Sequence, residues 1–231
     1  DFKFYERINV PPPTWCPECR SMRRMASRNI RNLYKRKCDA TGGDIISIYS
    51  PDKEVKVYEQ KYWWGDEWDP KDYAQDYDFS KPFFEQLAEL IKKVPFPSLP
   101  NLNPVNSEYV SMTIDSKNCH LIFSSTSNED CSYSEGINNC LGSIDLIACR
   151  DLERSYFCVD CKNSFNLQYS LKCIGCSDSM FLYDCRNCTN CFGCFNLRNA
   201  SYQIFNEQYS KEDYFKKLES FKKYDLRHSI R

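Results

Sequence analysis

The chain has 231 residues, of which 31 are Lys or Arg, 32 are Asp or Glu, 15 are Cys and only 2 are His. Because the charges nearly balance, net charge selects no class of partner. A hydrophobic content of 42% permits a sizeable core, but no apolar run approaches the roughly 18 residues of a membrane span. The sequence also has no Walker loop, dinucleotide-binding Gly turn, HExxH or GxSxG motif, and we expect no enzyme.

The distribution of charge divides the chain into four segments. Residues 1–50 carry ten basic and five acidic side chains, whereas residues 51–95 and 105–209 are acidic and residues 210–231 are basic again. Proline is frequent over 95–104, which predicts a linker. We therefore expect a zinc-knuckle and basic-helix module over 1–60 and an aromatic, acidic segment with a helix and linker over 61–104. A β-solenoid over 105–209 and a capping helix over 210–231 complete the expected order.

Three cysteines near the N-terminus predict a zinc site. Cys16 and Cys19 have the C-x2-C spacing with which two thiolates hold one tetrahedral ion, and Cys38 begins a second knuckle-like turn. Thr41 stands where that knuckle would carry its last Cys, so either a fourth ligand comes from residues upstream of Asp1 or the site is incomplete. The alternative is that Cys16, Cys19 and Cys38 are ordinary thiols without a metal.

The segment between these cysteines, residues 20–37, contains eight basic side chains and no acidic one. At about 100° per residue a helix over this segment would align five of the cations on one face, opposite an apolar face. Aligned cations repel one another, and arginine gives bidentate contacts to phosphate, so we expect a nucleic-acid partner. A solvated face, or contact with the acidic 51–95 segment, is the alternative. The candidate nucleic-acid-binding residues are Arg20, Arg23, Arg24, Arg28, Arg31, Lys35, Arg36 and Lys37.

Short strands are expected next, over residues 45–49 and 55–58. Trp63, Trp64 and Trp68 follow among acidic residues, which indicates an aromatic core with acidic loops, or alternatively a surface for a protein partner. A helix with an apolar face is predicted to start at Ser80-Lys81-Pro82 and to run to Val94.

The second half of the chain is a repeat. All twelve cysteines from Cys119 to Cys194 fall in one phase of a three-residue count, and charged residues are absent from that phase. This row predicts the inward face of a narrow parallel β-solenoid, making the fold mainly β. Because a branched aliphatic residue recurs every fifteen positions, we expect 15-residue coils with five inward residues each. Those aliphatic residues are Ile122, Ile137, Leu152, Leu167, Leu182 and Leu197.

The cysteines of the repeat allow several interpretations. Their run from Cys185 to Cys194 resembles an iron–sulfur motif, and the C-x2-C pairs resemble zinc knuckles. With 15-residue coils, the columns 158/173/188 and 161/176/191 would gather six thiols for a soft metal. We favour thiols packed as small hydrophobic side chains in a reducing, cytoplasmic compartment. A helix beginning at Ser210 would then cover the last coil.

Several resemblances accompany these patterns. The solenoid resembles the β-helix of beetle antifreeze proteins in architecture only, since the outward Thr-x-Thr row of ice binding is missing. Residues 11–20, 33–39, 45–53 and 183–186 resemble an uncharacterised cysteine-rich family of environmental bacteria with very small genomes, a likeness that implies no settled activity. Residues 14–38 resemble small zinc-containing ribosomal proteins.

These features predict a non-enzymatic RNA-binding protein, associated with the ribosome and contacting rRNA phosphates through the arginine helix. The zinc knuckle would hold that helix, and the solenoid would be a rigid spacer. A metal- or thiol-handling protein that uses the cysteine columns, and a protein-interaction scaffold, are the alternatives. Neither a membrane nor a small-molecule substrate is expected.

Overall fold

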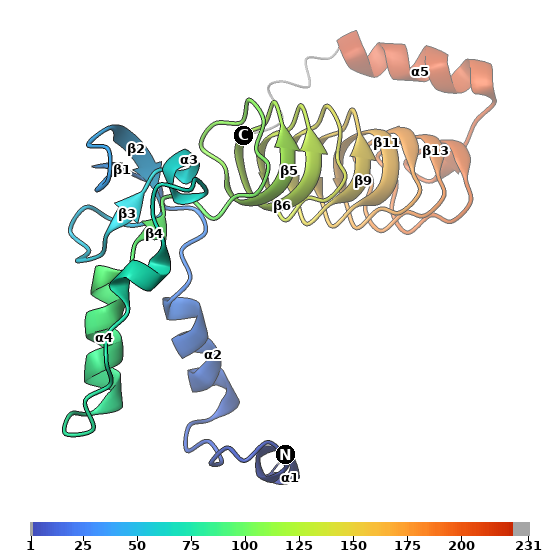
Figure 1. The fold of residues 1–231 in the computed structure, drawn as a ribbon. Coiled ribbons are helices and arrows are strands. Elements are labelled where there is room, and N and C mark those ends of the chain that lie inside the picture. The colour runs from blue at the N-terminus through green and yellow to red at the C-terminus, as the bar shows by residue number, and fades with distance from the viewer. Residues whose placement is uncertain (1, 224–231) are drawn as a thin grey trace.

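The computed structural model describes residues 2–223. A small mixed module occupies the N-terminal part, a long β-solenoid follows, and a helix lies beside the far end of the solenoid (Figure 1). No helix within residues 2–223 has the length and apolar character needed to cross a bilayer. The fold is thus mainly β, with a parallel solenoid of about eight turns, as the sequence predicted.

Short elements make up the N-terminal module. Its helices are α1 (Phe2–Arg7), α2 (Pro17–Ala26), α3 (Gln60–Trp63), the 3-10 helix η1 (Pro70–Tyr73) and α4 (Phe83–Lys93). Its strands are β1 (Tyr34–Lys37), β2 (Asp44–Ser47), β3 (Val57–Tyr58) and β4 (Phe96–Pro97). Strands β1 and β2 form an antiparallel hairpin, and β3 pairs in parallel with β4.

The predicted basic helix over residues 20–37 is wrong in its second half, since α2 ends at Ala26. Beyond it, the Asn29 side chain accepts the N–H of Asn32 at 3.0 Å and donates to the Ile48 carbonyl at 2.7 Å. These bonds turn the chain toward β2, and the segment from Tyr34 onward then pairs as a strand. The five-cation helical stripe therefore does not form.

The prolines of residues 95–104 do not exclude a strand, contrary to the prediction of a linker. Phe96 donates its N–H to the Lys56 carbonyl at 2.9 Å, and Ser98 donates to Tyr58 at 2.8 Å. Pro97 lies between these two donors, where parallel pairing requires no N–H. The pairing joins β3 to β4, so residues 57–58 and 96–97 belong to one module and residue 60 marks no domain boundary.

The solenoid consists of parallel strands paired in a register of twelve residues. Tyr156 pairs with Ile144 on one side and with Gln168 on the other, and the same offset recurs along the whole sheet. The predicted coil of fifteen residues is therefore wrong: a coil has twelve residues and four inward positions. The strands are β5 (Ser111–Lys117), β6 (His120–Glu129), β7 (Ser132–Glu135), β8 (Ile144–Ile147), β9 (Arg150–Glu153), β10 (Tyr156–Val159), β11 (Lys162–Leu171), β12 (Ser177–Met180), β13 (Thr189–Phe192) and β14 (Ser201–Ile204).

The fifteen-residue spacing of aliphatic residues has a different physical cause. In a twelve-residue coil, a step of fifteen moves a large side chain one coil along and one inward position around. Leu152 and Leu167 accordingly lie in different columns, and Leu167 is stacked between Ser155 and Ser179 in its own column. Apart from Val110 and Ile122, which stack near the start of the solenoid, large inward side chains are separated by small ones within each column and follow a spiral around the narrow core, which we call the staircase.

The corners of the coil explain the three-residue phase. Every third residue from Asn103 to Phe205 has φ between 45° and 65°, so each coil makes four left-handed corners. Asn, Asp and Gly tolerate this conformation best, and they occupy many of the corners. Stacked corners also bond to one another, as where Asn118 donates from its amide to Asp130 at 3.0 Å.

Inward serine and cysteine side chains satisfy backbone groups that face the core. Ser155 Oγ donates to the Glu153 carbonyl at 3.1 Å and accepts the N–H of Leu167, twelve residues on, at 3.2 Å. The inward cysteines instead donate to carbonyls, as where the Cys131 thiol donates to Glu129 and to Cys140, both at 3.3 Å. Because an unpaired buried polar group is costly, many inward positions carry a small side chain that hydrogen-bonds to the backbone, and this explains the abundance of Ser and Cys.

The two ends of the solenoid are closed differently. At the first coil, the buried Asn101 amide donates to the Val110 carbonyl at 2.8 Å and accepts the N–H of Thr113 at 3.2 Å. At the last coil, β15 (Glu207–Gln208) turns back antiparallel to β14 and protects its edge.

Helix α5 (Lys211–Lys223) begins at the predicted Ser210, whose Oγ accepts the Asp213 N–H at 3.1 Å. The helix packs through Tyr214 on the outer residues Phe192 and Ile204, along the flank of the last coils rather than over the open end of the core as expected (Figure 1). The predicted capping segment extends to residue 231, and its last part, 224–231, lies outside the described residues.

Candidate nucleic-acid interface

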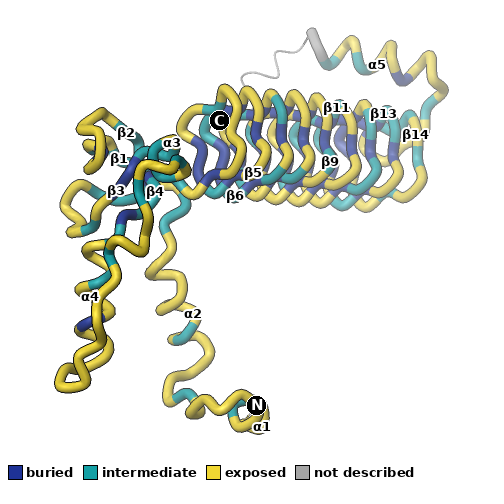
Figure 2. The backbone as a smooth tube through the Cα atoms, viewed as in Figure 1, coloured by how far each residue is buried: buried dark blue, intermediate teal, exposed yellow. Residues whose placement is uncertain are grey.

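Helix α2 begins with a cysteine cap. Cys16 precedes the helix, and its sulfur accepts the N–H of Cys19 at 3.3 Å, while Pro17 occupies the first helical position. Glu18 lies in the first turn and Arg23 and Arg24 in the last, which matches the helix dipole. No residue of α2 is buried, and the helix projects from the β-strands of the module (Figure 2).

An arginine-lined hollow of about 500 Å³ opens at this helix. Arg20 is partly buried and donates to the Tyr5 hydroxyl at 3.0 Å. Arg23 lies over the exposed ring of Trp15, at 5.1 Å from the ring centroid. None of the lining side chains is acidic. The hollow is lined by Pro13, Thr14, Trp15, Arg20, Arg23, Arg24 and Ser27, and we call it the arginine hollow.

The remaining predicted cations are used differently. Three of them form ion pairs: Arg31 with Glu135 on the solenoid, Arg36 with Asp39 at 3.1 Å and Lys37 with Asp44 at 2.7 Å. Arg36 also donates to the carbonyls of Ser50 and Val55, so it holds the hairpin together. Within residues 2–223, Arg28 and Lys35 are exposed and have no ion pair.

The structure therefore brings together Arg20, Arg23 and Arg24 and disperses the other five. Sequence reasoning missed Tyr5 and the role of Trp15, although the position of Trp15 directly before the C-x2-C pair was a usable signal.

The three predicted zinc ligands do not come together. Cys16 and Cys19 are exposed at the start of α2, whereas Cys38 is buried in the hairpin, where its sulfur accepts the Glu59 N–H at 3.3 Å. Among residues 2–223 no group of three or more His, Cys, Asp or Glu side chains is placed to hold a metal ion. Cys16 and Cys19 thus offer two thiolates, and completing a tetrahedral site would require ligands other than Cys38.

The thiols of the N-terminal module should differ sharply in reactivity. The Cys19 N–H lowers the pKa of Cys16 below its usual value, which increases the thiolate fraction at neutral pH. In chelator-treated native protein we expect iodoacetamide to modify Cys16 and Cys19 within minutes and the thirteen buried cysteines only after unfolding. The rate at which iodoacetamide modifies Cys16 should rise with pH and reach a plateau at a pH below the ordinary pKa of a thiol. Peptide mass spectrometry measures this, and rapid native labelling of Cys38 would contradict the placement.

The three tryptophans have separate roles. Trp68 donates its indole N–H to the Trp63 carbonyl at 2.9 Å, and Trp63 donates to Pro95 at 3.4 Å, so both help to pack the module. Trp64 is exposed. The predicted aromatic core thus includes Trp63 and Trp68, and of the three only Trp64 presents a large free surface.

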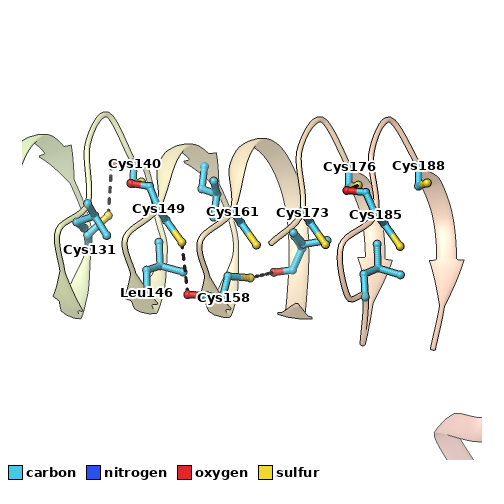
Figure 3. Close-up of a cluster of buried hydrophobic side chains, with 14 of the residues drawn as sticks. Cys131, Cys140, Leu146, Cys149, Cys158, Cys161, Cys173, Cys176, Cys185 and Cys188 are labelled. Carbon is cyan, nitrogen blue, oxygen red and sulfur yellow. Dashed lines mark hydrogen bonds between the residues drawn. The ribbon is translucent and has the colours of Figure 1, made fainter. Parts of the chain in front are cut away.

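The twelve-residue coil also changes the cysteine columns of the solenoid. Cys158, Cys173 and Cys188 lie in three different columns, and so do Cys161, Cys176 and Cys191, because each set steps by fifteen. The six-thiol cluster expected from those two columns is therefore wrong. Consecutive thiols instead stack at intervals of twelve residues (Figure 3).

Comparisons with known proteins add little. No family model matches the chain, and no curated protein matches it either. Among solved structures, a hexapeptide transferase family protein from Anaplasma phagocytophilum aligns with 57% of this chain and 89% of its own, at 11% identity and a TM-score of 0.17. A TM-score of this size supports no argument about activity, and the proposed function must rest on the chain's own residues.

Proposed function

We propose that this chain is a non-enzymatic RNA-binding protein that contacts phosphates through the arginine hollow. The observation that carries the proposal is the convergence of Arg20, Arg23 and Arg24 on a solvent-open hollow with no acidic lining residue. Guanidinium groups bind phosphate oxygens in a bidentate manner, and three close cations repel one another until an anion arrives. A polyanion relieves that repulsion.

The exposed Trp15 favours single-stranded RNA over a regular duplex. Unpaired bases stack on aromatic rings and guanidinium planes, and RNA loops present such bases. Trp15 with Arg23 above it forms a platform of this kind beside the phosphate-binding side chains. The dimensions of the hollow suit one or two nucleotides, so the expected partner is a local RNA feature.

The rest of the molecule supports this role. The Arg31–Glu135 ion pair ties the basic module to the solenoid, which would act as a rigid spacer or partner platform. The exposed Trp64 offers a contact surface for a protein partner. A zinc ion at Cys16 and Cys19 would brace the start of α2. The many buried free thiols that donate hydrogen bonds to the backbone suit a reducing compartment, and we place the protein in the cytoplasm.

Sedimentation of native lysate tests the ribosomal part of the proposal. In a low-salt sucrose gradient we expect this chain to comigrate with a ribosomal particle, and at high salt to be released, because phosphate contacts weaken with salt. Nuclease treatment of the lysate is the control and should move the chain to the top of the low-salt gradient. A chain that stays at the top in both salts is not associated with the ribosome.

A further inference from the structure

Four cysteines in consecutive coils form an uninterrupted column in the solenoid core. Each follows the previous one by twelve residues, and Ile137 and Leu197 close the column at its two ends. The four thiols are at most 1% exposed. The column consists of Cys149, Cys161, Cys173 and Cys185, and we call it the thiol column.

The sulfurs of the thiol column point the same way. Figure 3 shows them in a row, one per coil, with their side chains in parallel orientation. Adjacent strands of a parallel sheet lie about 4.8 Å apart, so neighbouring Cβ atoms and neighbouring sulfurs are separated by about that distance. The spacing is set by the backbone ladder and is the same at each step.

This spacing is poorly suited to disulfides. A disulfide places its two Cβ atoms about 3.5–4.5 Å apart, and the ladder holds them farther from each other. Two metal–sulfur bonds in a line, at about 2.3 Å each, span about 4.6 Å, which matches the coil spacing. The column therefore accommodates an ion between two sulfurs better than a bond between them.

We propose that the thiol column binds monovalent thiophilic cations of the Cu(I) and Ag(I) class, each ion in linear coordination between the sulfurs of two consecutive coils. Soft thiolates select such ions. For each ion bound, two S–H bonds break, two metal–sulfur bonds form and two protons pass to solvent, with no change of oxidation state. Four thiols hold two ions. This linear site needs only two ligands, and the proposal stands independently of RNA binding.

The thiols of the column donate hydrogen bonds to the carbonyl two residues before them. The sulfur-to-oxygen distances are 3.3 Å from Cys149 to Ile147, 3.4 Å from Cys161 to Val159 and 3.3 Å from Cys173 to Leu171. These are the protons that leave when the sulfurs bind an ion.

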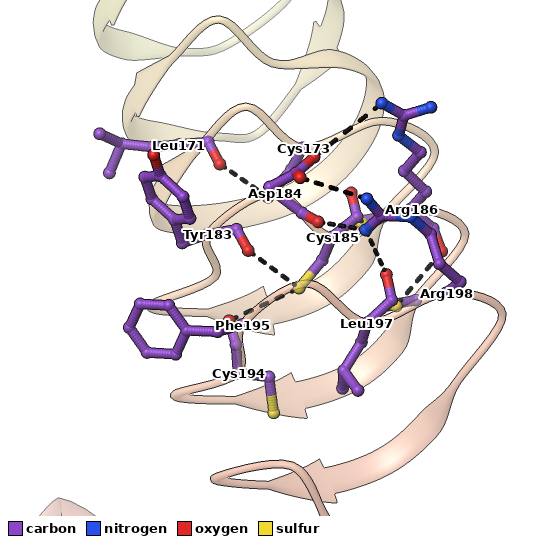
Figure 4. A network of polar contacts seen from close by, with 12 residues as sticks. Leu171, Cys173, Tyr183, Asp184, Cys185, Arg186, Cys194, Phe195, Leu197 and Arg198 are labelled. Carbon is purple, nitrogen blue, oxygen red and sulfur yellow. Dashed lines mark hydrogen bonds and ion pairs between the residues drawn. The ribbon is translucent and has the colours of Figure 1, made fainter.

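The last thiol of the column has the most favourable surroundings. The Arg198 guanidinium lies near the Cys185 sulfur, and a positive charge there favours the thiolate that binds the ion. Figure 4 shows Arg198 paired with Asp184 beside Cys185, at an N–O distance of 3.2 Å. As a thiol, Cys185 donates its proton toward the carbonyls of Tyr183 and Cys194, and this proton is the one lost on binding.

Metal loading during refolding tests the proposal. The full chain carrying Cys16→Ser and Cys19→Ser, which removes the exposed pair, is refolded anaerobically with Ag(I) or with Cu(I), desalted, and analysed for metal per chain. The column variant adds Cys161→Ser and Cys173→Ser, leaving Cys149 and Cys185 without thiol neighbours. The matched control adds Cys140→Ser and Cys158→Ser, which remove two buried thiols outside the column.

Serine occupies inward positions throughout the solenoid and, like the cysteines, donates to the carbonyl two residues before it, so both variants should fold, and circular dichroism checks this. The column variant should bind about two fewer ions per chain than the control, and X-ray absorption of the control should show two sulfur neighbours per ion. Pairs such as Cys119 and Cys131 contribute equally to both variants. Equal metal content in the two variants, or metal in neither, would overturn the proposal.

Discussion

Replacing Leu167 with alanine should lower the free energy of unfolding by about 2–5 kcal/mol, because the substitution removes buried methyl groups and leaves a cavity. Leu167 is fully buried, and the serines above and below it in its column are too small to fill the space. Backbone ladders on each face hold the coil walls apart, so collapse around the cavity is limited.

The matched control for this prediction is Leu171→Ala. Leu171 lies on the same strand, β11, but is 39% exposed, and its replacement should cost well under half as much. Urea unfolding followed by far-ultraviolet circular dichroism measures both variants. Equal losses for the two leucines would contradict the inward assignment of Leu167 and, with it, the staircase of aliphatic side chains.

Removing two arginines from the hollow should weaken RNA binding by roughly two orders of magnitude. In the Arg23→Ala/Arg24→Ala variant two charge-assisted phosphate contacts are lost, each contributing about 1.5 kcal/mol. The slope of log affinity against log salt should become shallower by about 1.4, since each phosphate contact on a single strand contributes about 0.7. Fluorescence anisotropy with a labelled RNA oligonucleotide measures both quantities.

Arg31→Ala/Lys37→Ala is the charge-matched control. It also removes two positive charges, but it takes them from exposed side chains that are paired with Glu135 and Asp44. Its affinity and salt slope should remain close to those of the unaltered chain. If both double variants lose affinity equally, binding follows net charge and the arginine hollow is not the site.

The solenoid could be predicted from the sequence because one physical constraint acts on every third residue. The left-handed corners turn each third side chain inward, so the cysteines and serines fall in phase however long the coil is. The coil length could not be read in the same way. The aliphatic residues from Ile122 to Leu197 repeat every fifteen residues because each lies one coil along and one inward position around from the one before. Only the twelve-residue strand register shows that the coil itself is shorter than this repeat.

The end of helix α2 could not be predicted from the local sequence pattern of residues 20–37. Helical spacing placed Arg28, Arg31 and Lys35 beside Arg20 and Arg24, and nothing in the segment itself forbids that. Contacts distant in sequence decide otherwise: Asn29 bonds to Ile48, and the strand that follows pairs with β2. Such pairing depends on the partner strand, so propensity within 20–37 could not reveal it.

The strand at Pro97 could not be predicted from the sequence for a related reason. A proline excludes a strand only where its missing N–H is needed, and at Pro97 the neighbours Phe96 and Ser98 make the required bonds. The pairing of Cys16 and Cys19 at the head of α2 was predictable from spacing alone, whereas the distance of Cys38 from them depends on the hairpin fold.

A salt titration of RNA binding by the unaltered full chain is the direct test of phosphate binding by the arginine hollow. With Arg20, Arg23 and Arg24 each neutralising one phosphate, the slope of log affinity against log salt should be about −2 for a single-stranded oligonucleotide. Binding should also be stronger to that strand than to a blunt duplex of the same length, because Trp15 needs an unpaired base. No measurable binding at low salt, or an affinity that salt does not change, would contradict RNA binding through the arginine hollow.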